Sequence, residues 1–191
     1  MTDPVDVVLA FPSQKDWKRW LAKNHSKSSG IWLKFFKKDA GIASVTYDEA
    51  LDEALCYGWI DGQLKKYDEK SYIQKFTPRR KKSLWSKRNK DHVARLISEG
   101  RMTQSGLKEI ELAKADGRWD RGYDSPSNMK IPDDFLKEVS KNKKSKEFFD
   151  TLNRANKYSI AWRLQTATKP ETRQKRMKAI LEMLKEGKKF H

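Results

Sequence analysis

The stretch from Thr46 to Ser86 limits the possible folds of this chain more than any other part of its sequence. It begins with Thr46-Tyr47-Asp48-Glu49, a capping box in which the threonine hydroxyl can accept from the third helical N–H while the glutamate reaches back to the cap N–H. Apolar residues then recur at helical spacing, and the opposite side carries Asp48, Glu49, Asp52 and Glu53. We expect a helix with one core face and one acidic face, whose carboxylates complement the helix dipole rather than catalyse a reaction.

Two glycines, Gly58 and Gly62, bracket Trp59-Ile60-Asp61 directly after this helix. Gly58 can take the left-handed conformation that ends a helix, and Gly62 adds a second permissive backbone point. The pattern predicts a turn that holds Trp59 and Asp61 in fixed positions. The Asp61 carboxylate can then accept from an arginine, act as a base in a pocket, or cap its own local backbone as an Asx turn.

The segment Arg79–Lys90 is the most basic window in the chain, with seven cations and no anion. Because Pro78 fixes the approach of the chain, we expect Arg79 or Arg80 to form an ion pair with Asp61 or to bind an anionic ligand. Trp85 in the same segment can stack on a ligand, although a buried core position is the commoner place for such a residue. The candidate ligand-binding residues are therefore Trp59, Asp61, Arg79, Arg80 and Trp85.

The charge of the whole chain agrees with an anionic partner but does not select one. Its 42 basic and 26 acidic residues give a formal net charge of +16, which favours phosphate-rich polymers, anionic membranes or acidic metabolites. A lysine surface kept for solubility explains the same number. Any binding of nucleic acid is expected to be non-specific in sequence and to weaken steeply with salt, because release of counterions drives it.

The remaining patterns predict an α+β fold. A helix capped by Ser13, a strand at Ile31–Lys37, and two short strands at 64–66 and 71–77 give a small antiparallel sheet of about three strands packed by helices. Helices at about 87–99 and 104–116 complete a first domain, residues 1–122. An all-helical domain, residues 123–191, follows, with helices at about 132–139, 145–152, 156–167 and from Pro170 onward.

Cys56 is the single cysteine, so the chain can form no intramolecular disulfide, and a zinc site built on thiolates is not expected. The three histidines are isolated in the sequence, and no phosphate-cradling glycine loop occurs, so we expect no metal and no cofactor. We also expect a cytoplasmic protein, because no signal-like N-terminal region and no apolar stretch of about 20 residues is present.

Several longer motifs resemble the YdeI/OmpD-associated family, also called bacteriocin-protection proteins. The matching pieces are Phe11–Ser13, Val45–Leu51, Ala54–Gln63, Phe76–Arg80, Trp85-Ser86, Asp116–Trp119, Tyr123–Pro126 and Lys169–Arg173. The N-terminal part also looks like YdhG-type α+β domains, and the last third looks like the short helical module of the family. The resemblance implies a role in envelope stress and resistance to antimicrobial peptides, and it carries no catalytic residue over to this chain.

These observations favour a stress-protection or adaptor protein that binds an anionic ligand or a protein partner through Arg79–Lys90, with the Trp59–Asp61 turn as one wall. The alternative is an enzyme that acts on a small molecule in a pocket near Trp59, Asp61 and Arg79. A third hypothesis is a structural protein that only binds partners. A pocket with Asp61 at its base would favour the enzyme, and a basic face would favour the adaptor.

Overall fold

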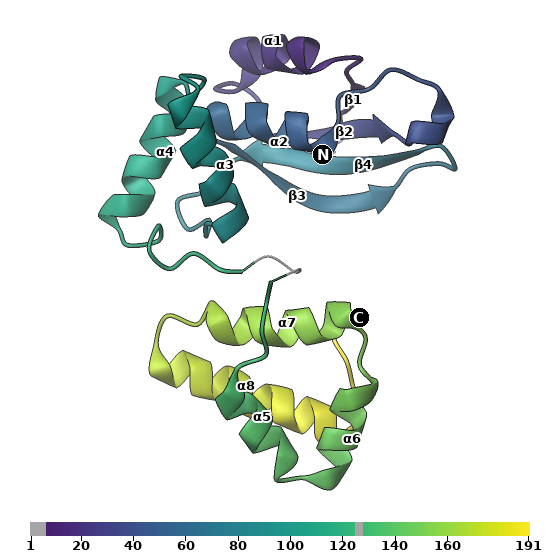
Figure 1. Cartoon of the computed structure of the whole chain (residues 1–191), viewed down its shortest axis with the longest axis vertical. Helices are drawn as coiled ribbons and strands as arrows, with labels where there is room; N and C mark the ends of the chain where they lie inside the picture. The colour runs from purple at the N-terminus through teal and green to yellow at the C-terminus, as the bar shows by residue number, and fades with distance from the viewer. Residues whose placement is uncertain (1–6, 125–127) are drawn as a thin grey trace, which may run out of the picture. The chain divides into compact units, whose positions relative to one another are not determined.

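The computed structural model describes residues 7–124 and 128–191, so the Ser125-Pro126 part of the last tyrosine-containing motif lies outside the described residues. The chain forms two compact units. Unit 1 comprises Met1–Leu84 and Asn89–Asp120, and unit 2 comprises Trp85–Arg88 and Arg121–His191. Each unit has its own set of helices, and unit 1 also contains the sheet (Figure 1).

The sheet of unit 1 has four strands in the order β1-β2-β4-β3. The strands are β1 (Val8–Ala10), β2 (Ile31–Phe36), β3 (Trp59–Lys66) and β4 (Ser71–Pro78). The last three pair antiparallel, which agrees with the expected small sheet, whereas β1 is an additional strand that pairs parallel to β2. A strand of three residues is too short to show an alternating pattern, so the sequence gives no signal for β1.

The α-helices of unit 1 lie where the sequence analysis expects helices, whereas the short 3₁₀ turn at Lys38–Ala40 is an addition to it. They are α1 (Gln14–Asn24), the 3₁₀ turn η1 (Lys38–Ala40), α2 (Tyr47–Cys56), α3 (Lys87–Ser98) and α4 (Gln104–Ala115). The predicted capping box of α2 is confirmed: Thr46 Oγ1 accepts from Glu49 N at 3.4 Å, and Glu49 Oε2 accepts from Thr46 N at 2.8 Å. The predicted Ser13 cap of α1 is confirmed as well.

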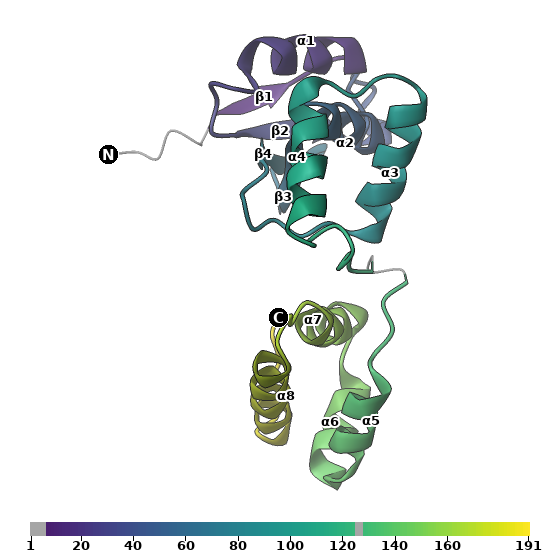
Figure 2. The same cartoon turned by 90° about the vertical axis from the view of Figure 1, so that its left-hand side faces the viewer.

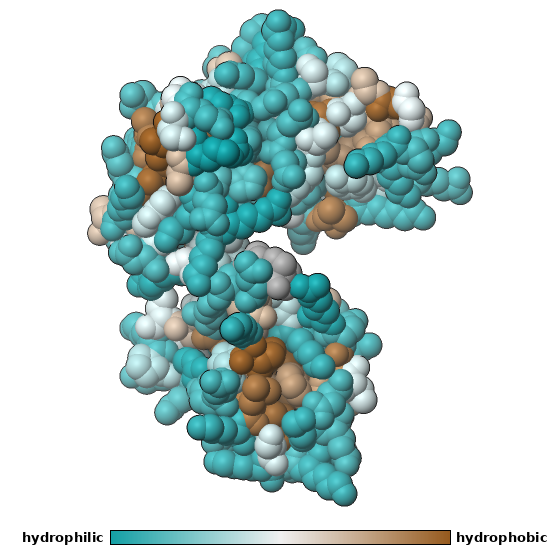
Figure 3. All heavy atoms as spheres, viewed as in Figure 1, coloured by the Kyte–Doolittle hydropathy of each residue, from teal (hydrophilic) through white to brown (hydrophobic). Residues whose placement is uncertain are grey.

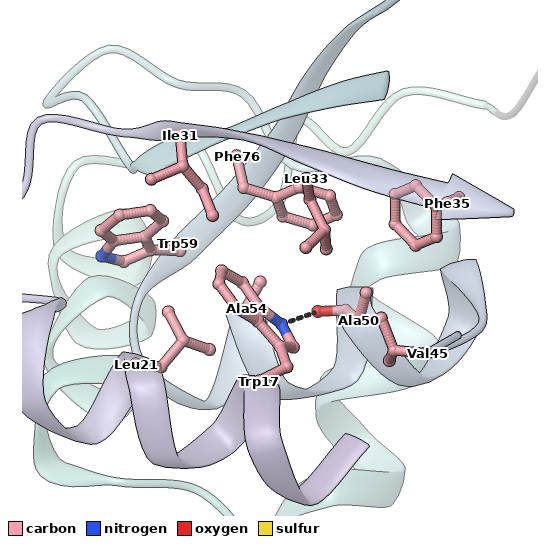
Figure 4. Packing of buried hydrophobic residues seen from close by; sticks show 10 residues of the cluster. All are labelled: Trp17, Leu21, Ile31, Leu33, Phe35, Val45, Ala50, Ala54, Trp59 and Phe76. Atoms are coloured by element: carbon pink, nitrogen blue, oxygen red, sulfur yellow. Dashed lines mark hydrogen bonds between the residues drawn. The ribbon is translucent and has the colours of Figure 1, made fainter. Parts of the chain in front are cut away.

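The core of unit 1 lies between the sheet and the helices α1 and α2 (Figure 4). Its buried members are Trp17, Leu21, Ile31, Leu33, Phe35, Val45, Ala50, Ala54, Trp59 and Phe76. The indole Nε1 of Trp17 donates to the Ala50 carbonyl at 3.0 Å, which ties α1 to α2 inside the core. Because side chains alternate along β2, residues 32, 34 and 36 point to the opposite face of the sheet.

The C-terminal end of α2 meets the N-terminal end of α4 at close range; Figure 2 shows α4 from the side. The Cys56 carbonyl accepts from the backbone N–H of Thr103 at 3.2 Å and from its hydroxyl at 2.6 Å. A Cβ atom added to Gly106 would lie only 2.3 Å from the same carbonyl. Glycine at position 106 therefore allows two helix backbones to touch. Burial raises the pKa of the Cys56 thiol to about 12, so this side chain packs as a small apolar group.

The expected acidic face of α2 is partly wrong, because two of its four carboxylates are buried. Asp52 is 7% exposed and Glu53 is 2% exposed. Asp52 binds the guanidinium of Arg95 at 2.6 Å and lies 2.7 Å from His92 Nδ1, whereas Glu53 binds Arg101 at 2.6 Å. These partners come from α3 and from the loop before α4, so the carboxylates hold the second half of unit 1 to α2.

Unit 2 is helical in the part that the structure describes. Besides the segment Trp85–Arg88, it contains α5 (Asp133–Ser140), α6 (Lys143–Thr151), α7 (Arg154–Gln165) and α8 (Pro170–Lys185). All four helices contribute to one apolar core, which includes Phe135, Phe149, Ile160 and Leu184. The buried Asn156 accepts from the backbone N–H groups of Phe190 and His191 and so fixes the C-terminal residues. None of the described helices in either unit is long and apolar enough to cross a membrane.

Removal of the α2 cap should weaken unit 1 measurably. We expect Thr46→Ala to lower the free energy of unfolding by about 1 kcal/mol and Glu49→Ala to lower it by less, because the threonine hydroxyl satisfies a helical N–H that has no other partner. Urea unfolding followed by circular dichroism measures both changes. Thr46→Ser keeps the hydroxyl and serves as the control; a Thr46→Ala variant that unfolds with the wild type would show that the cap contributes nothing.

The buried carboxylate of Asp52 should make the free energy of unfolding depend on pH in the acidic range. Burial raises the pKa of Asp52, but the hydrogen bonds and positive charges of Arg95 and His92 outweigh burial and lower this pKa below its ordinary value of 3.8. When the pKa of a carboxyl group is lower in the folded than in the unfolded state, its ionised form stabilises the fold. This stabilisation is fully present above the unfolded-state pKa, and it is lost as the pH falls through the folded-state pKa. We therefore expect Asp52→Asn to cost about 2 kcal/mol at neutral pH, as for charge-assisted hydrogen bonds, and less and less below pH 3.8.

Free energies of unfolding of wild type and Asp52→Asn, measured in urea from neutral to acidic pH, test this expectation. Glu111→Gln, which neutralises an exposed carboxylate of α4, is the matched control. A gap between Asp52→Asn and wild type that stays constant down to the lowest pH would contradict the assigned direction of the pKa.

Candidate anion-binding site

The residues that follow α2 form the beginning of a strand rather than the predicted turn. Gly58 does end the helix, with φ at 75° in the left-handed region, but Trp59 and Asp61 already belong to β3. Trp59 is 1% exposed, and its indole Nε1 donates to the His25 carbonyl at 3.0 Å. Its ring packs edge-on against Trp17 and Trp20. The Trp59 side chain is therefore a core element and not a wall open to a ligand.

Asp61 does not form the expected ion pair with Arg79 or Arg80. Its Oδ2 atom accepts from the Tyr47 hydroxyl at 2.9 Å and from the Gln74 side-chain amide at 3.0 Å. Both donors are neutral, and both come from the helix-covered side of the sheet. The same Gln74 amide also reaches the Gly62 carbonyl at 3.4 Å, so it fixes the β3 backbone as well as the carboxylate.

Arg79 has a structural place between β3 and the basic loop. It is 7% exposed, its backbone N–H donates to the Gly58 carbonyl at 3.0 Å, and its guanidinium donates to the Leu84 carbonyl at 3.3 Å. These contacts fasten the loop that follows β4 to the beginning of β3. Arg80, in contrast, is exposed.

Trp85 belongs to unit 2 and is 2% exposed. Its backbone carbonyl accepts from Tyr123 N at 3.0 Å, and Tyr123 in turn accepts from Lys87 N at 2.8 Å. The segment after Leu84 thus pairs with residues of its own unit. Of the five candidate residues, Trp59, Asp61, Arg79 and Arg80 lie in unit 1 but do not form one site, and Trp85 lies in the other unit.

The seven cations of the basic segment have different surroundings. Lys87 forms an ion pair with Asp124 at 2.7 Å, and Lys90 donates to the Trp119 carbonyl at 3.1 Å while its ammonium lies over the Trp119 ring. The exposed loop between β4 and α3 carries Arg80, Lys81 and Lys82. Three of the seven cations therefore lie together in this exposed loop, while Lys87 and Arg88 are exposed at the beginning of α3.

A β-bulge shapes the surface beside that loop. The pairs Asp61–Phe76 and Leu64–Gln74 are three residues apart on β3 and two apart on β4, so β3 carries one extra residue around Gly62. A bulge bends its strand and redirects side chains, and bulges are common next to binding sites. Gly62, predicted as a permissive backbone position after the turn, thus lies at a bulge within β3.

Next to the bulge lies a pocket of about 490 Å³, the basic pocket, formed by both strands and by the loop. It is lined by Ile60, Gly62, Gln63, Lys75, Thr77, Pro78, Arg80 and Ser83. The backbone N–H of Arg80 donates to the Ser83 hydroxyl at 3.0 Å, and Ser83 N donates back to the Arg80 carbonyl at 2.8 Å, so the rim is a closed turn. Two cations and no carboxylate line this pocket.

Lysines also lie over aromatic rings on the face of the sheet opposite α1 and α2. Lys65 and Lys75 lie 4.5 and 5.7 Å from the Trp32 ring, and Lys34 lies 4.8 Å from Phe36. Strand register places Lys75 directly beside Trp32. This face therefore continues the positive surface of the basic pocket, with Lys34 balanced by Asp68 at 3.2 Å.

Gln63, Lys75, Thr77 and Ser83 line the pocket but are not among the candidate ligand-binding residues of the sequence analysis, although Gln63 and Thr77 lie within its motifs. Lys75 and Thr77 alternate with the buried Gln74 and Phe76, and this alternation is the only signal that could have indicated them. Neither Trp59, Asp61 nor Arg79 lines the pocket. In the part of the chain that the structure describes, no three His, Cys, Asp or Glu side chains gather as metal ligands would.

Two known families match the chain, one in the N-terminal part and one in the C-terminal part, and this division is similar to that of the two structural units. Residues 9–109 match a family described as Domain of unknown function (DUF8412), in place of the YdhG-type domain expected there. Residues 128–187, in unit 2, match the family described as Bacteriocin-protection, YdeI or OmpD-Associated. No curated protein and no solved structure matches the chain. Since the first match covers more than half of its residues, the chain belongs to the DUF8412 family, joined to a C-terminal part similar to the bacteriocin-protection family.

Proposed function

We propose that this protein is a stress-protection or adaptor protein that binds an anionic ligand or the anionic surface of a partner through the basic pocket and the adjoining Arg80–Lys82 loop. The observation that carries the proposal is the lining of the pocket, in which Lys75 and Arg80 are accompanied by no carboxylate. The match of residues 128–187 to the bacteriocin-protection family supports the stress-related role.

The chemistry of the pocket suits an oxyanion such as a phosphate group. A guanidinium offers a planar fork of donors and an ammonium offers a point charge, and charge-assisted hydrogen bonds from such groups are stronger than neutral ones. Gln63, Thr77 and Ser83 add an amide and two hydroxyls to the same lining. The pocket can therefore surround an anion with several donors.

Rigidity of the surrounding backbone favours binding further. The Arg79 guanidinium and backbone hold the loop to Leu84 and Gly58, and Gln74 holds the bulge. A site that is already ordered loses less conformational entropy when a ligand binds. The expected role of Arg79 as a ligand contact is thus replaced in our proposal by a positioning role, with Arg80 as the contact.

The surface around the pocket favours extended anions over small ones. Lys65 and Lys75 line one edge of the sheet face over Trp32, and Lys81 and Lys82 follow Arg80 in the loop. A chain of phosphates can contact several of these cations at once, whereas a single phosphate reaches only the pocket. An adaptor that recognises a polyanion would show this preference.

Binding of a fluorescein-labelled single-stranded oligonucleotide and of tripolyphosphate, by anisotropy and calorimetry, tests the proposal. We expect the double variant Lys75→Gln/Arg80→Gln to weaken binding about tenfold, which corresponds to about 1.4 kcal/mol. Binding of the oligonucleotide should fall steeply between about 50 and 200 mM salt, and the slope should be smaller in the variant, because fewer counterions are released.

Lys143→Gln/Lys144→Gln is the matched control, since it removes the same charge from an exposed position on α6 of unit 2. This control should bind as wild type does. Equal weakening in both double variants would show that only the net charge attracts the probe. Absence of binding to either probe at low salt would refute the proposed function.

A further inference from the structure

A second cavity of about 490 Å³ lies at the other end of β2 and β4, where the chain passes through η1 into α2. We call it the aromatic pocket; it is lined by Phe35, Phe36, Lys37, Lys38, Gly41, Ile42, Ala43, Ser44, Val45, Thr46, Tyr47 and Tyr72. It shares no lining residue with the basic pocket. The function proposed above makes no use of it.

Part of the wall of the aromatic pocket consists of aromatic and aliphatic side chains. The rings of Phe35 and Tyr72 stack with centroids 5.1 Å apart and planes inclined by 15°. Val45 is buried, whereas Ile42 is 50% exposed. Pockets lined by aromatic and aliphatic groups with a few polar atoms are typical of small-molecule sites, and flat rings favour a planar ligand.

Asp61 positions one of these walls. Its carboxylate accepts a hydrogen bond from the Tyr47 hydroxyl at 2.9 Å and another from the Gln74 side-chain amide at 3.0 Å. Tyr47 is the first residue of α2, directly after the capping box of Thr46. The Tyr47 ring is therefore fixed from both ends, by the helix cap and by the sheet, before any ligand arrives.

The polar groups of the aromatic pocket favour a negative charge. Its lining contains Lys37 and Lys38 and no carboxylate, and Asp39, the next residue in the chain, does not line it. Lys37 donates to the Glu69 carbonyl at 2.6 Å, which leaves Lys38 as the more available cation. Lysine ammonium at the rim of an apolar pocket attracts an anionic group on a ligand whose body lies inside.

The Tyr72 hydroxyl supplies a donor in the same pocket. Among residues 7–124 and 128–191 it has no hydrogen-bond partner, whereas the hydroxyls of Ser44, Thr46 and Tyr47 are all engaged. Burial raises the pKa of Tyr72, so the phenol keeps its proton at neutral pH and can donate. A partly buried hydroxyl without a protein partner gains free energy when a ligand acceptor reaches it.

We infer that the aromatic pocket is a binding site for a small planar aromatic anion, such as an aryl carboxylate or aryl sulfonate. The aromatic body of the ligand lies against Tyr47 and Tyr72, and its anionic group is bound by Lys38 and the Tyr72 hydroxyl. Asp61 acts as a positioning residue through Tyr47 and does not touch the ligand.

Titration with 1-anilinonaphthalene-8-sulfonate tests this site, because the probe is an aromatic anion whose fluorescence rises in apolar surroundings. We expect saturable binding of one equivalent, with shifts of backbone amide NMR signals confined to residues 35–47 and the neighbourhood of Tyr72. Benzoate should displace the probe, and acetate at the same concentration should not, because it has the charge without the ring.

Single substitutions measure how much the Lys38 ammonium and the Tyr72 hydroxyl each contribute to binding of the probe. Lys38→Gln should weaken binding roughly tenfold and Tyr72→Phe roughly threefold, in line with the loss of a charge-assisted and a neutral hydrogen bond. Tyr72→Phe keeps the ring that stacks on Phe35, and circular dichroism of each variant confirms that it is folded. Lys144→Gln and Lys75→Gln/Arg80→Gln should bind the probe as wild type does.

Three results would overturn the inference: no saturable binding of the probe, equal binding by Lys38→Gln, Tyr72→Phe and wild type, or displacement by acetate as effective as by benzoate. NMR shifts centred on the basic pocket instead would assign the probe to the other site. Because the two pockets share no lining residue, the experiments can refute the proposed ligand of one pocket without affecting the proposal for the other.

Discussion

The contact between the end of α2 and the beginning of α4 sets the geometry on which both pockets depend. The Cys56 carbonyl, which the helix leaves without an intrahelical partner, accepts from the backbone and the hydroxyl of Thr103. Gly106 permits this approach because any Cβ there would overlap the same carbonyl. The positive end of one helix thus meets the negative end of the other, which is favourable for both dipoles. α2 therefore ends at a fixed place.

Gly58 follows the end of α2 in the left-handed conformation, and β3 begins at the next residue with a defined register against β4. Trp59 enters the core and Asp61 faces Tyr47 and Gln74, so Ile60 between them faces the opposite side of the sheet. One strand thus serves two surfaces: Ile60 and Gly62 line the basic pocket, and Asp61 supports the wall of the aromatic pocket. A shift of one residue in this register would exchange the two faces.

Local signals in the sequence predict the parts of the fold that local chemistry decides. The caps at Ser13 and Thr46 and the helix-ending Gly58 follow from hydrogen-bonding and backbone preferences within a few residues, and they are found where predicted. Burial of Asp52 and Glu53 depends on Arg95 and Arg101, more than 40 residues away, which no helical pattern in α2 can indicate. The expected ion pair between Asp61 and an arginine does not form, because two neutral donors, Tyr47 and Gln74, bind this partly buried carboxylate from the helix-covered side of the sheet.

The lysines on the sheet face also have a structural role, because they cover apolar surface of unit 1. Trp32 is only 5% exposed although it points away from α1 and α2, and the ammonium groups of Lys65 and Lys75 lie over its ring. Long cationic side chains can cover apolar surface while their charged ends stay in water. An anion bound at Lys75 would therefore compete with the Trp32 ring for the same ammonium, and a cation–π contact is worth about 0.5–1 kcal/mol at an exposed site and about 2 kcal/mol at a desolvated one. In the proposed function, a multiply charged anion that also contacts Arg80 offsets the loss of this contact, so Lys75 would cover the Trp32 ring in the empty pocket and bind the ligand in the filled one.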